Sequence, residues 1–279
     1  MNPFNAPVYH VPVCASTMDV ARSVEKDGAP HGTVVAADFQ SAGRGRTARR
    51  VWESRAAENL LCTVILRYGQ FSAIPPAFSL QAGLAVCCAI EQFAPALAGK
   101  LAIKWPNDVM ISGRKTAGIL VESDGTCVFA GIGVNVAQTV FAGAPHATSI
   151  VNEAGAGVLD GYSGGGASSG GGDSSGGGWE GSARRALLAI ILERLFYGLR
   201  TDDSFIDQVR ARLYLRGERV CFAAGGADGA PSGAREVYGV LDGIGRGGEL
   251  RILRDGAREP ECFVTGEIRL RGDAYTCRI

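Results

Sequence analysis

Cationic side chains crowd into one short segment near the N-terminal end of the chain. Residues 40–50 read Gln-Ser-Ala-Gly-Arg-Gly-Arg-Thr-Ala-Arg-Arg, with four arginines in seven positions, directly after an apolar, β-branched run. Gly43 and Gly45 allow the backbone to approach a ligand closely. Guanidinium groups match the geometry of phosphate and carboxylate. The segment therefore predicts an anion-binding loop; a solvated basic loop and a minor-groove hook for DNA are the alternatives.

A second charged segment reads Lys-Trp-Pro-Asn-Asp over residues 104–108. Pro-Asn-Asp is a turn signal between two strand-like runs, so Lys104 and Asp108 are expected at strand ends, with Lys115 on the next strand. Lysines and arginines neutralise phosphate, and a carboxylate can hold Mg²⁺ or orient a hydroxyl. Beside the arginine loop, this set favours nucleotidyl chemistry. Taken alone, the segment is equally consistent with an ordinary charged hairpin.

Two glycine-rich segments resemble nucleotide-binding motifs without meeting their requirements. Residues 113–116, Gly-Arg-Lys-Thr, lack the glycine that a P-loop has directly before its lysine. Residues 243–248 match GxGxxG, but strand-like runs flank them and no helix follows, which predicts a hairpin. A third segment, residues 131–136, ends a predicted strand and is expected to pass close to a ligand.

The elements that must position these residues are mostly strands linked by hairpins. Strands are predicted over 8–13, 33–39, 59–67, 102–105, 109–111, 116–122 and 126–136, and helices over 16–26, 75–93, 183–199 and 203–213. Ser16 and Asp19 form a capping-box-like pair at the start of the first helix. This pattern predicts an α+β domain on a mixed or antiparallel sheet.

A low-complexity segment interrupts the chain at residues 161–178, where fifteen of eighteen residues are Gly or Ser. Such a composition cannot offset the entropy of ordering, so a flexible insertion is expected, and its deletion should change turnover by only a few-fold. After residue 215, short strands over 219–223, 234–241, 249–253 and 261–264 predict a small β-barrel. The predicted domains are therefore 1–214 and 215–279.

The composition excludes several classes of protein. The 279 residues carry 28 basic and 28 acidic side chains, a balance that argues against a general nucleic-acid or anionic-membrane coat. The apolar stretch over 77–90 falls short of the roughly 18 residues that span a membrane, and no signal peptide is recognisable. Eight cysteines without a CxxC pair are expected to be reduced core thiols, as in a cytoplasmic protein. Three dispersed histidines argue against a zinc site.

At the charged segments the sequence resembles the biotin–protein ligase (biotin–acetyl-CoA-carboxylase ligase) family. The matching motifs occur in the family's order: Ser16-Thr17-Met18 for Ser-Thr-Asn, the loop from Gly43 to Arg49 for GRGRxGR, Lys104 to Asp108 for KWPND, Gly113 to Glu122 for RKxAGILVE, and Gly131 to Val136 for GIGxN. The resemblance is strong from about residue 16 to residue 150 and weaker beyond.

The resemblance implies a class II synthetase-like catalytic domain, with a mixed sheet flanked by helices, and a small C-terminal SH3-like barrel. Family members use ATP and Mg²⁺ to convert biotin to biotinyl-5′-AMP and pyrophosphate, and transfer biotin to a lysine of a biotin carboxyl carrier protein. Some members also carry an N-terminal DNA-binding domain. Only fifteen residues precede Ser16 here, so a ligase without a repressor role, monomeric or weakly dimeric, is expected.

The resemblance also implies roles for individual residues. The implied catalytic residues are Lys115, Arg46, Arg44 and Asp108. The implied biotin-binding residues are Ser16, Thr17, Met18, Gln40, Gly43, Arg44, Gly45, Arg46, Lys115 and Gly118. The implied ATP-binding residues are Arg46, Arg49, Trp52, Lys104, Asn107 and Asn135, and Asp108 is the implied Mg²⁺ ligand. Trp52 and Trp105 are candidate walls of the pocket.

Two departures from the family pattern affect the predicted pocket. Ala48 stands where the loop has its last glycine, and Met18 stands in place of an asparagine, which removes an amide from the site. Lipoate–protein ligase shares the fold and the adenylation chemistry and is the alternative, although it lacks the KWPND turn. An octanoyltransferase would need a catalytic cysteine, and Cys62, Cys87, Cys88 and Cys127 all lie in apolar runs.

Overall fold

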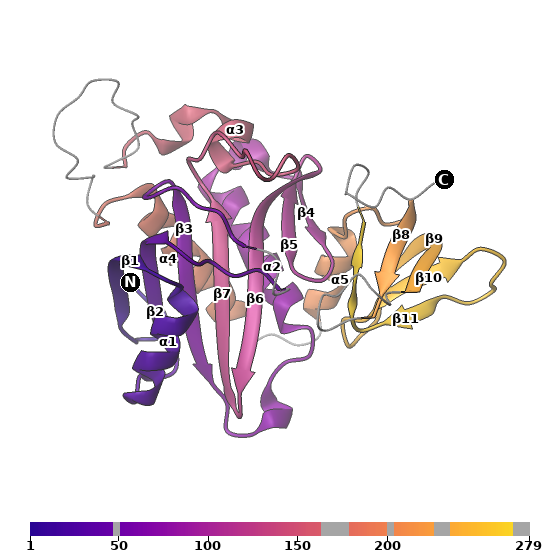
Figure 1. Ribbon diagram of the computed structural model, residues 1–279, viewed down its shortest axis with the longest axis horizontal. Helices are drawn as coiled ribbons and strands as arrows, with labels where there is room; N and C mark the ends of the chain where they lie inside the picture. The colour runs from indigo at the N-terminus through magenta and orange to yellow at the C-terminus, as the bar shows by residue number, and fades with distance from the viewer. Residues whose placement is uncertain (47–50, 163–178, 200–203, 226–234, 270–279) are drawn as a thin grey trace.

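A seven-stranded mixed sheet forms the centre of the molecule (Figure 1). The computed structural model describes residues 1–46, 51–162, 179–199, 204–225 and 235–269. The strands are β1 (Val8–Cys14), β2 (Thr33–Gln40), β3 (Asn59–Arg67), β4 (Leu101–Lys104), β5 (Asp108–Ile111), β6 (Arg114–Asp124) and β7 (Cys127–Asn135). Their order is β1-β2-β3-β7-β6-β5-β4, and β1 runs parallel to β2 while the other neighbours are antiparallel. The expected α+β fold on a mixed sheet is confirmed.

Helices cover both faces of this sheet (Figure 1). They are α1 (Thr17–Lys26), α2 (Phe78–Phe93), α3 (Ile150–Ala154), α4 (Ala183–Gly198) and α5 (Ser204–Ala211), with single 3₁₀ turns at Phe71–Ala73, Pro95–Leu97 and Ala156–Leu159. Alternate residues of β2 enter different cores, because successive side chains of a strand point to opposite faces. Val34 and Ala36 pack in the large core with α2 and α4, whereas Val35 packs in a smaller core beneath α1.

The helix predicted over 75–93 begins later than expected, at Phe78. Ala77 precedes it with a left-handed backbone (φ 57°), which cannot continue an α-helix. By length and composition, Phe71–Phe93 is the one segment among the described residues that could cross a membrane, so the expectation that no stretch is long enough is corrected. In this fold α2 is a core helix, buried against the sheet and α4.

The C-terminal strands form a second, smaller sheet (Figure 1). They are β8 (Arg219–Ala224), β9 (Arg235–Ile244), β10 (Leu250–Arg254), β11 (Glu261–Phe263) and β12 (Gly266–Ile268), in the order β11-β10-β9-β8-β12. Within the described residues β11 and β12 stay at opposite edges, so this sheet is open and the expected closed barrel is not confirmed. The hairpin predicted at residues 243–248 is confirmed between β9 and β10.

Trp105 joins the two sheets. Its indole Nε1 donates to the carbonyl of Gly248 at 2.9 Å, and its ring packs edge-on against Phe222, with centroids 5.9 Å apart. Arg210 adds a hydrogen bond from Nε to the carbonyl of Ile244 at 2.7 Å. One buried core continues from the large sheet into the small one. The boundary between 214 and 215 stays a prediction.

The cysteines follow the expectation of reduced core thiols only in part. Cys62, Cys87 and Cys127 are free and buried. Cys262 is free but exposed, and Cys221 is disulfide-bonded. The prediction of a reduced core thiol is therefore wrong for Cys262 and for Cys221.

Candidate functional site

A cavity of about 600 Å³ opens on the face of the sheet that carries α1. This volume lies within the range of small-molecule sites. The N-terminus of α1, the ends of β2 and β5, the middle of β3, β6 and β7, and residues 143–147 all contribute to its wall. Glu267 reaches it from the small C-terminal sheet. The cavity therefore collects side chains from positions spread over the whole chain.

A hydrogen-bond network occupies the end of the cavity beside α1. The backbone N–H and the hydroxyl of Thr17 both donate to Oε1 of Gln40, at 2.7 and 3.0 Å. The hydroxyls of Thr17 and Thr63 are 2.9 Å apart. Because the Thr17 proton is directed to Gln40, Thr63 must donate to Thr17. Within the described part of the chain, Nε2 of Gln40 and the lone pairs of Thr63 then remain available to a ligand.

Ser16 begins α1 as its N-cap, and its hydroxyl oxygen accepts from the backbone N–H of Met18 at 3.3 Å. The predicted capping box is wrong in its second half. The carboxylate of Asp19 pairs with Arg44 at 2.8 Å and does not reach back to the cap. The first turn of α1 thus holds the arginine loop as well as the polar end of the cavity.

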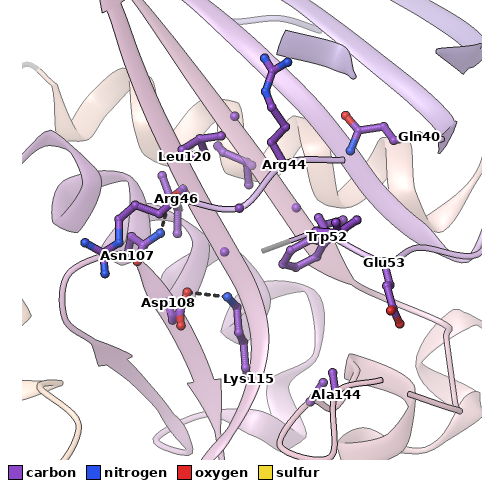
Figure 2. Close-up of a pocket in the computed structure, with 18 of the residues that line it drawn as sticks. Gln40, Arg44, Arg46, Trp52, Glu53, Asn107, Asp108, Lys115, Leu120 and Ala144 are labelled. Carbon is purple, nitrogen blue, oxygen red and sulfur yellow. Dashed lines mark hydrogen bonds and ion pairs between the residues drawn. The ribbon is translucent and has the colours of Figure 1, made fainter. Parts of the chain in front are cut away.

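An ion pair lies in the middle of the cavity (Figure 2). Nζ of Lys115, on β6, is 2.6 Å from Oδ1 of Asp108, on the neighbouring strand β5. The Asp108 side chain is 14% exposed and that of Lys115 is 35% exposed. A partly buried cation of this kind interacts more strongly with an incoming anion than a fully solvated one.

Trp52 lies over a floor made of glycines. Gly118 and Gly133 are opposite each other on β6 and β7, and a Cβ atom on Gly133 would be 2.7 Å from the Trp52 ring. Nζ of Lys115 lies 5.6 Å from the ring centroid, which is cation–π distance. Nε1 of Trp52 is buried and has no hydrogen-bond partner among the described residues. Trp52 therefore forms one wall of the cavity.

The arginine loop is tied to two distant parts of the fold. Arg44 pairs with Asp19, and Nη2 of Arg46 donates to the carbonyl of Gly266 at 2.9 Å. Figure 2 shows Arg44 directed away from the Lys115–Asp108 pair, whereas Arg46 lies beside Asn107. Both arginines are among the residues that line the cavity, and each guanidinium group is held by a protein group.

The turn after β4 is built as predicted, but one of its side chains is used by the fold. Nδ2 of Asn107 donates to the carbonyl of Ile119 at 2.7 Å, which fastens the turn to β6. Lys104 is buried, at 6% exposed, and lines the cavity. Trp105 also touches the cavity, although its main contacts join the two sheets.

The structure brings most of the predicted residues into this one cavity. They are Ser16, Thr17, Met18, Gln40, Arg44, Gly45, Arg46, Trp52, Lys104, Asn107, Asp108, Lys115 and Gly118. Gly43 and Asn135 do not line it. The carbonyl of Gly43 accepts from Trp52 N at 2.9 Å, and the Asn135 amide donates to the carbonyl of Thr148 at 2.9 Å. Arg49 and Ala48 lie outside the described residues, as do residues 163–178 of the insertion.

Sequence reasoning missed several residues of the wall. Thr63 carries the one hydroxyl in an apolar strand, a local signal that was available. Glu53, residues 143–147 and Glu267 carry no local signal, because strand pairing and the packing of the small sheet bring them to the cavity.

Cys62 is among the residues around the cavity, but its side chain packs in the large core on the other face of the sheet. Burial raises the pKa of its thiol to about 12. The nucleophile in cysteine chemistry is the thiolate, which is scarce at neutral pH for such a group. The geometry gives no support to an octanoyltransferase that would use this thiol.

Part of the chain is similar to a known protein family. Residues 11–136 match the sequence profile of the biotin/lipoate A/B protein ligase family. Over these residues the chain is similar to that family. The bifunctional ligase/repressor BirA of Bacillus subtilis is 40% identical over 136 residues, which cover 47% of this chain and 40% of that protein. The biotin–[acetyl-CoA-carboxylase] ligase of Mycobacterium tuberculosis is 38% identical over 125 residues, which cover 43% of this chain and 46% of that protein. The chain thus spans less than half the length of these two relatives.

The family resemblance extends to the whole fold. The biotin protein ligase of Aquifex aeolicus in complex with biotin and ATP aligns with a TM-score of 0.70, over 94% of this chain and 97% of that chain, at 22% identity. The likeness at this level of identity is one of fold, and it covers both sheets.

Proposed function

We propose that this chain is an ATP-dependent biotin–protein ligase. The observation that carries the proposal is the pairing, in one cavity, of a polar end and a cationic centre. The head of biotin is a cyclic urea, with one carbonyl acceptor between two N–H donors. Nε2 of Gln40 and the lone pairs of Thr63 match that urea. Lys115, Arg44 and Arg46 match the carboxylate and the phosphates.

The proposed reaction has two steps. An oxygen of the biotin carboxylate attacks the α-phosphorus of ATP, the bond to the bridging oxygen breaks, and pyrophosphate leaves with the electron pair. The amine of an acceptor lysine then attacks the acyl carbon and gives up a proton, and AMP leaves. No enzyme nucleophile is required. The work of the protein is to hold two mutually repelling anions together and to stabilise the charge that develops.

Mg²⁺ would enter as MgATP. Among the described residues no group of three or more acidic, histidine or cysteine side chains is arranged to hold a metal. A metal carried mainly by substrate phosphates needs only one or two carboxylates from the protein. Asp108 is the carboxylate nearest to Lys115 and is the candidate for that contact.

The acceptor is proposed to be the lysine of a biotin carboxyl carrier protein, by analogy with the relatives named as acetyl-CoA-carboxylase ligases. We also propose that this chain, as a monomer or weak dimer in the cytoplasm, does not bind duplex DNA, since its basic and acidic side chains balance. An electrophoretic mobility shift at physiological salt tests that statement.

ATP–pyrophosphate exchange on the purified chain tests the proposed function, with biotin, lipoate or no acid added. Exchange that depends on biotin alone supports the biotin ligase. Exchange that depends on lipoate alone would move the function to the lipoate–protein ligases of the same fold. Absence of exchange with either acid would refute the adenylation step.

A further inference from the structure

The backbone of Lys115 is hydrogen-bonded differently from the rest of β6. Farther along the strand β6 pairs with β7, and that pairing begins only at Ala117. The N–H of Lys115 instead donates to the carbonyl of His146 at 2.7 Å, and the N–H of Thr148 donates to the carbonyl of Lys115 at 2.8 Å. These two bonds form a parallel bridge. The bridge ties Lys115 to residues 143–147, which form part of the cavity wall.

A β-bulge lies at the same point of the sheet. The register between β5 and β6 shifts between Lys115 and Ala117, which leaves Thr116 as the extra residue. A bulge bends its strand and changes the direction of the neighbouring side chains. The direction of the Lys115 side chain is therefore set at a bulge, where the parallel bridge supplies the backbone hydrogen bonds on one side.

Glu153, on α3, holds the segment that makes this bridge. Its side chain is 10% exposed, and Oε1 accepts from the hydroxyl of Thr148 at 2.6 Å. The same oxygen also pairs with Arg114. Thr148 is fully buried, so its hydroxyl would lose a hydrogen bond without this carboxylate, at a cost in free energy. One carboxylate thus fixes the residue before Lys115 and the residue that bonds to the Lys115 carbonyl.

We propose that Glu153 is a positioning residue, which acts through the Thr148 hydroxyl and the backbone of Lys115 to hold the lysine ammonium in place for adenylation. This inference rests on the proposed biotin ligase function. The described residues that line the cavity do not include Glu153, so its effect is indirect. A displacement of about 1 Å can cost about a hundredfold in rate. The polar end of the cavity is built by α1, β2 and β3, so kcat should change more than the KM for biotin.

Three variants test the link through the Thr148 hydroxyl, by pyrophosphate exchange in the purified full chain. E153M removes the carboxylate and keeps a side chain of similar length; kcat is expected to fall at least about tenfold, and the KM for biotin to change less than about threefold. T148V removes the hydroxyl and is expected to give a loss of the same size. E153Q keeps an oxygen that can accept from Thr148. It is expected to retain kcat within about threefold, because the pair with the half-exposed Arg114 contributes little.

The K115Q background separates positioning from general damage to the fold. If Glu153 acts through Lys115, E153M should cause less than about a twofold further loss in that background, since residues that act as a unit are not additive. E91M is the matched control. The Glu91 carboxylate is 17% exposed, accepts from Arg212 and from the Gly99 N–H, and is not among the described lining residues. E91M should keep kcat within about twofold even where it lowers the melting temperature, because distant sites without shared partners act independently.

A kcat within about twofold of the unsubstituted chain in both E153M and T148V would overturn the inference. An E153M loss of equal size with and without the Lys115 ammonium would overturn it as well. Both results leave biotin-dependent exchange by the unsubstituted chain intact, so they differ from a failure of the proposed function. In that failure the unsubstituted chain shows no exchange and the inference falls with it. T148V replaces one buried hydroxyl by a methyl group and keeps the test decisive if E153M does not fold.

Discussion

Replacing Lys115 by glutamine should reduce biotin-dependent pyrophosphate exchange by at least about a hundredfold. Nζ of Lys115 lies 2.6 Å from Asp108, at the centre of the cavity, beneath the Trp52 ring. We expect the ammonium to face the carboxylate and the α-phosphate at the moment when the new bond forms. Glutamine keeps the length of the side chain closely enough to fill the space and removes the charge.

The magnitude follows from the geometry. Two unit charges about 4 Å apart interact by about 4 kcal/mol at the effective dielectric constant of a protein surface. The Lys115 side chain is 35% exposed, so solvent screening reduces this figure. About 3 kcal/mol remains, which corresponds to a rate loss of about 150-fold and agrees with the usual cost of removing a group that stabilises a transition state. The Asp108 carboxylate left behind would add repulsion against both anions.

The assay is pyrophosphate exchange at saturating ATP with biotin varied, so that kcat and kcat/KM are separated. K100Q is the matched control, because it removes the same charge from an exposed lysine outside the cavity. The double variant D108N/K115Q also removes the carboxylate proposed to contact Mg²⁺, so it is expected to lose at least as much activity as K115Q. If K115Q retained more than a tenth of the exchange rate, while melting at the same temperature as the unsubstituted chain, the assignment of this cation to the reaction would be wrong.

The remaining predictions concern the polar end, the thiol and the loop. T63V keeps the shape of the side chain and removes its hydroxyl; it should raise the KM for biotin about tenfold with little effect on kcat, measured by the same exchange assay. Iodoacetamide at pH 8 should leave Cys62 unlabelled and label the exposed Cys262, as read by peptide mass spectrometry, and labelling of Cys62 in the folded chain would contradict its burial. Burial raises the pKa of Cys62 from about 9 in the unfolded chain to about 12 in the folded one. The contribution of this thiol to the free energy of unfolding should therefore be fully present below about pH 9 and decline between about pH 9 and 12, as measured by denaturant titration. R44Q should lower kcat/KM for biotin at least tenfold, whereas D19N should change the free energy of unfolding by less than about 1 kcal/mol, since the pair is about half exposed.

What the sequence predicts well here is local. The turn at residues 104–108 and the loop after β2 consist of consecutive residues whose types already specify a turn and an anion site, and the structure places both at the cavity. The strands were located to within a few residues, because β-branched and apolar runs are bounded by glycine and proline. Helix α2 begins later than predicted because the backbone of Ala77 is left-handed. An alanine in the sequence gives no sign of that conformation.

What the sequence does not predict is which distant residues meet. Gly131 lies beside Thr63 because of the antiparallel register of β3 and β7. Glu267 reaches the cavity because the small sheet docks through Trp105. Asn135 is a different case, because its assignment to ATP binding stays a prediction. A motif match favoured a ligand contact, whereas the fold uses its amide to fasten Thr148. A polar residue in a motif can serve the backbone as readily as a substrate, and only the partner atom distinguishes the two.

The partners of the cationic side chains explain how a chain with no net charge can handle two anions. Lys115 is held by Asp108, Arg44 by Asp19, and Arg46 by a backbone carbonyl of the small sheet. Each partner fixes a flexible side chain in place, so less reorganisation is needed when charge develops on the phosphorus. The carboxylate partners also reduce the attraction between the site and any passing anion. A site arranged in this way favours a ligand that presents both a urea and an anion over a simple phosphate, because neither end of the cavity alone provides the full binding energy. Inorganic phosphate should accordingly compete only weakly with biotin in the exchange assay, and strong competition at equal concentrations would contradict this balance of charges.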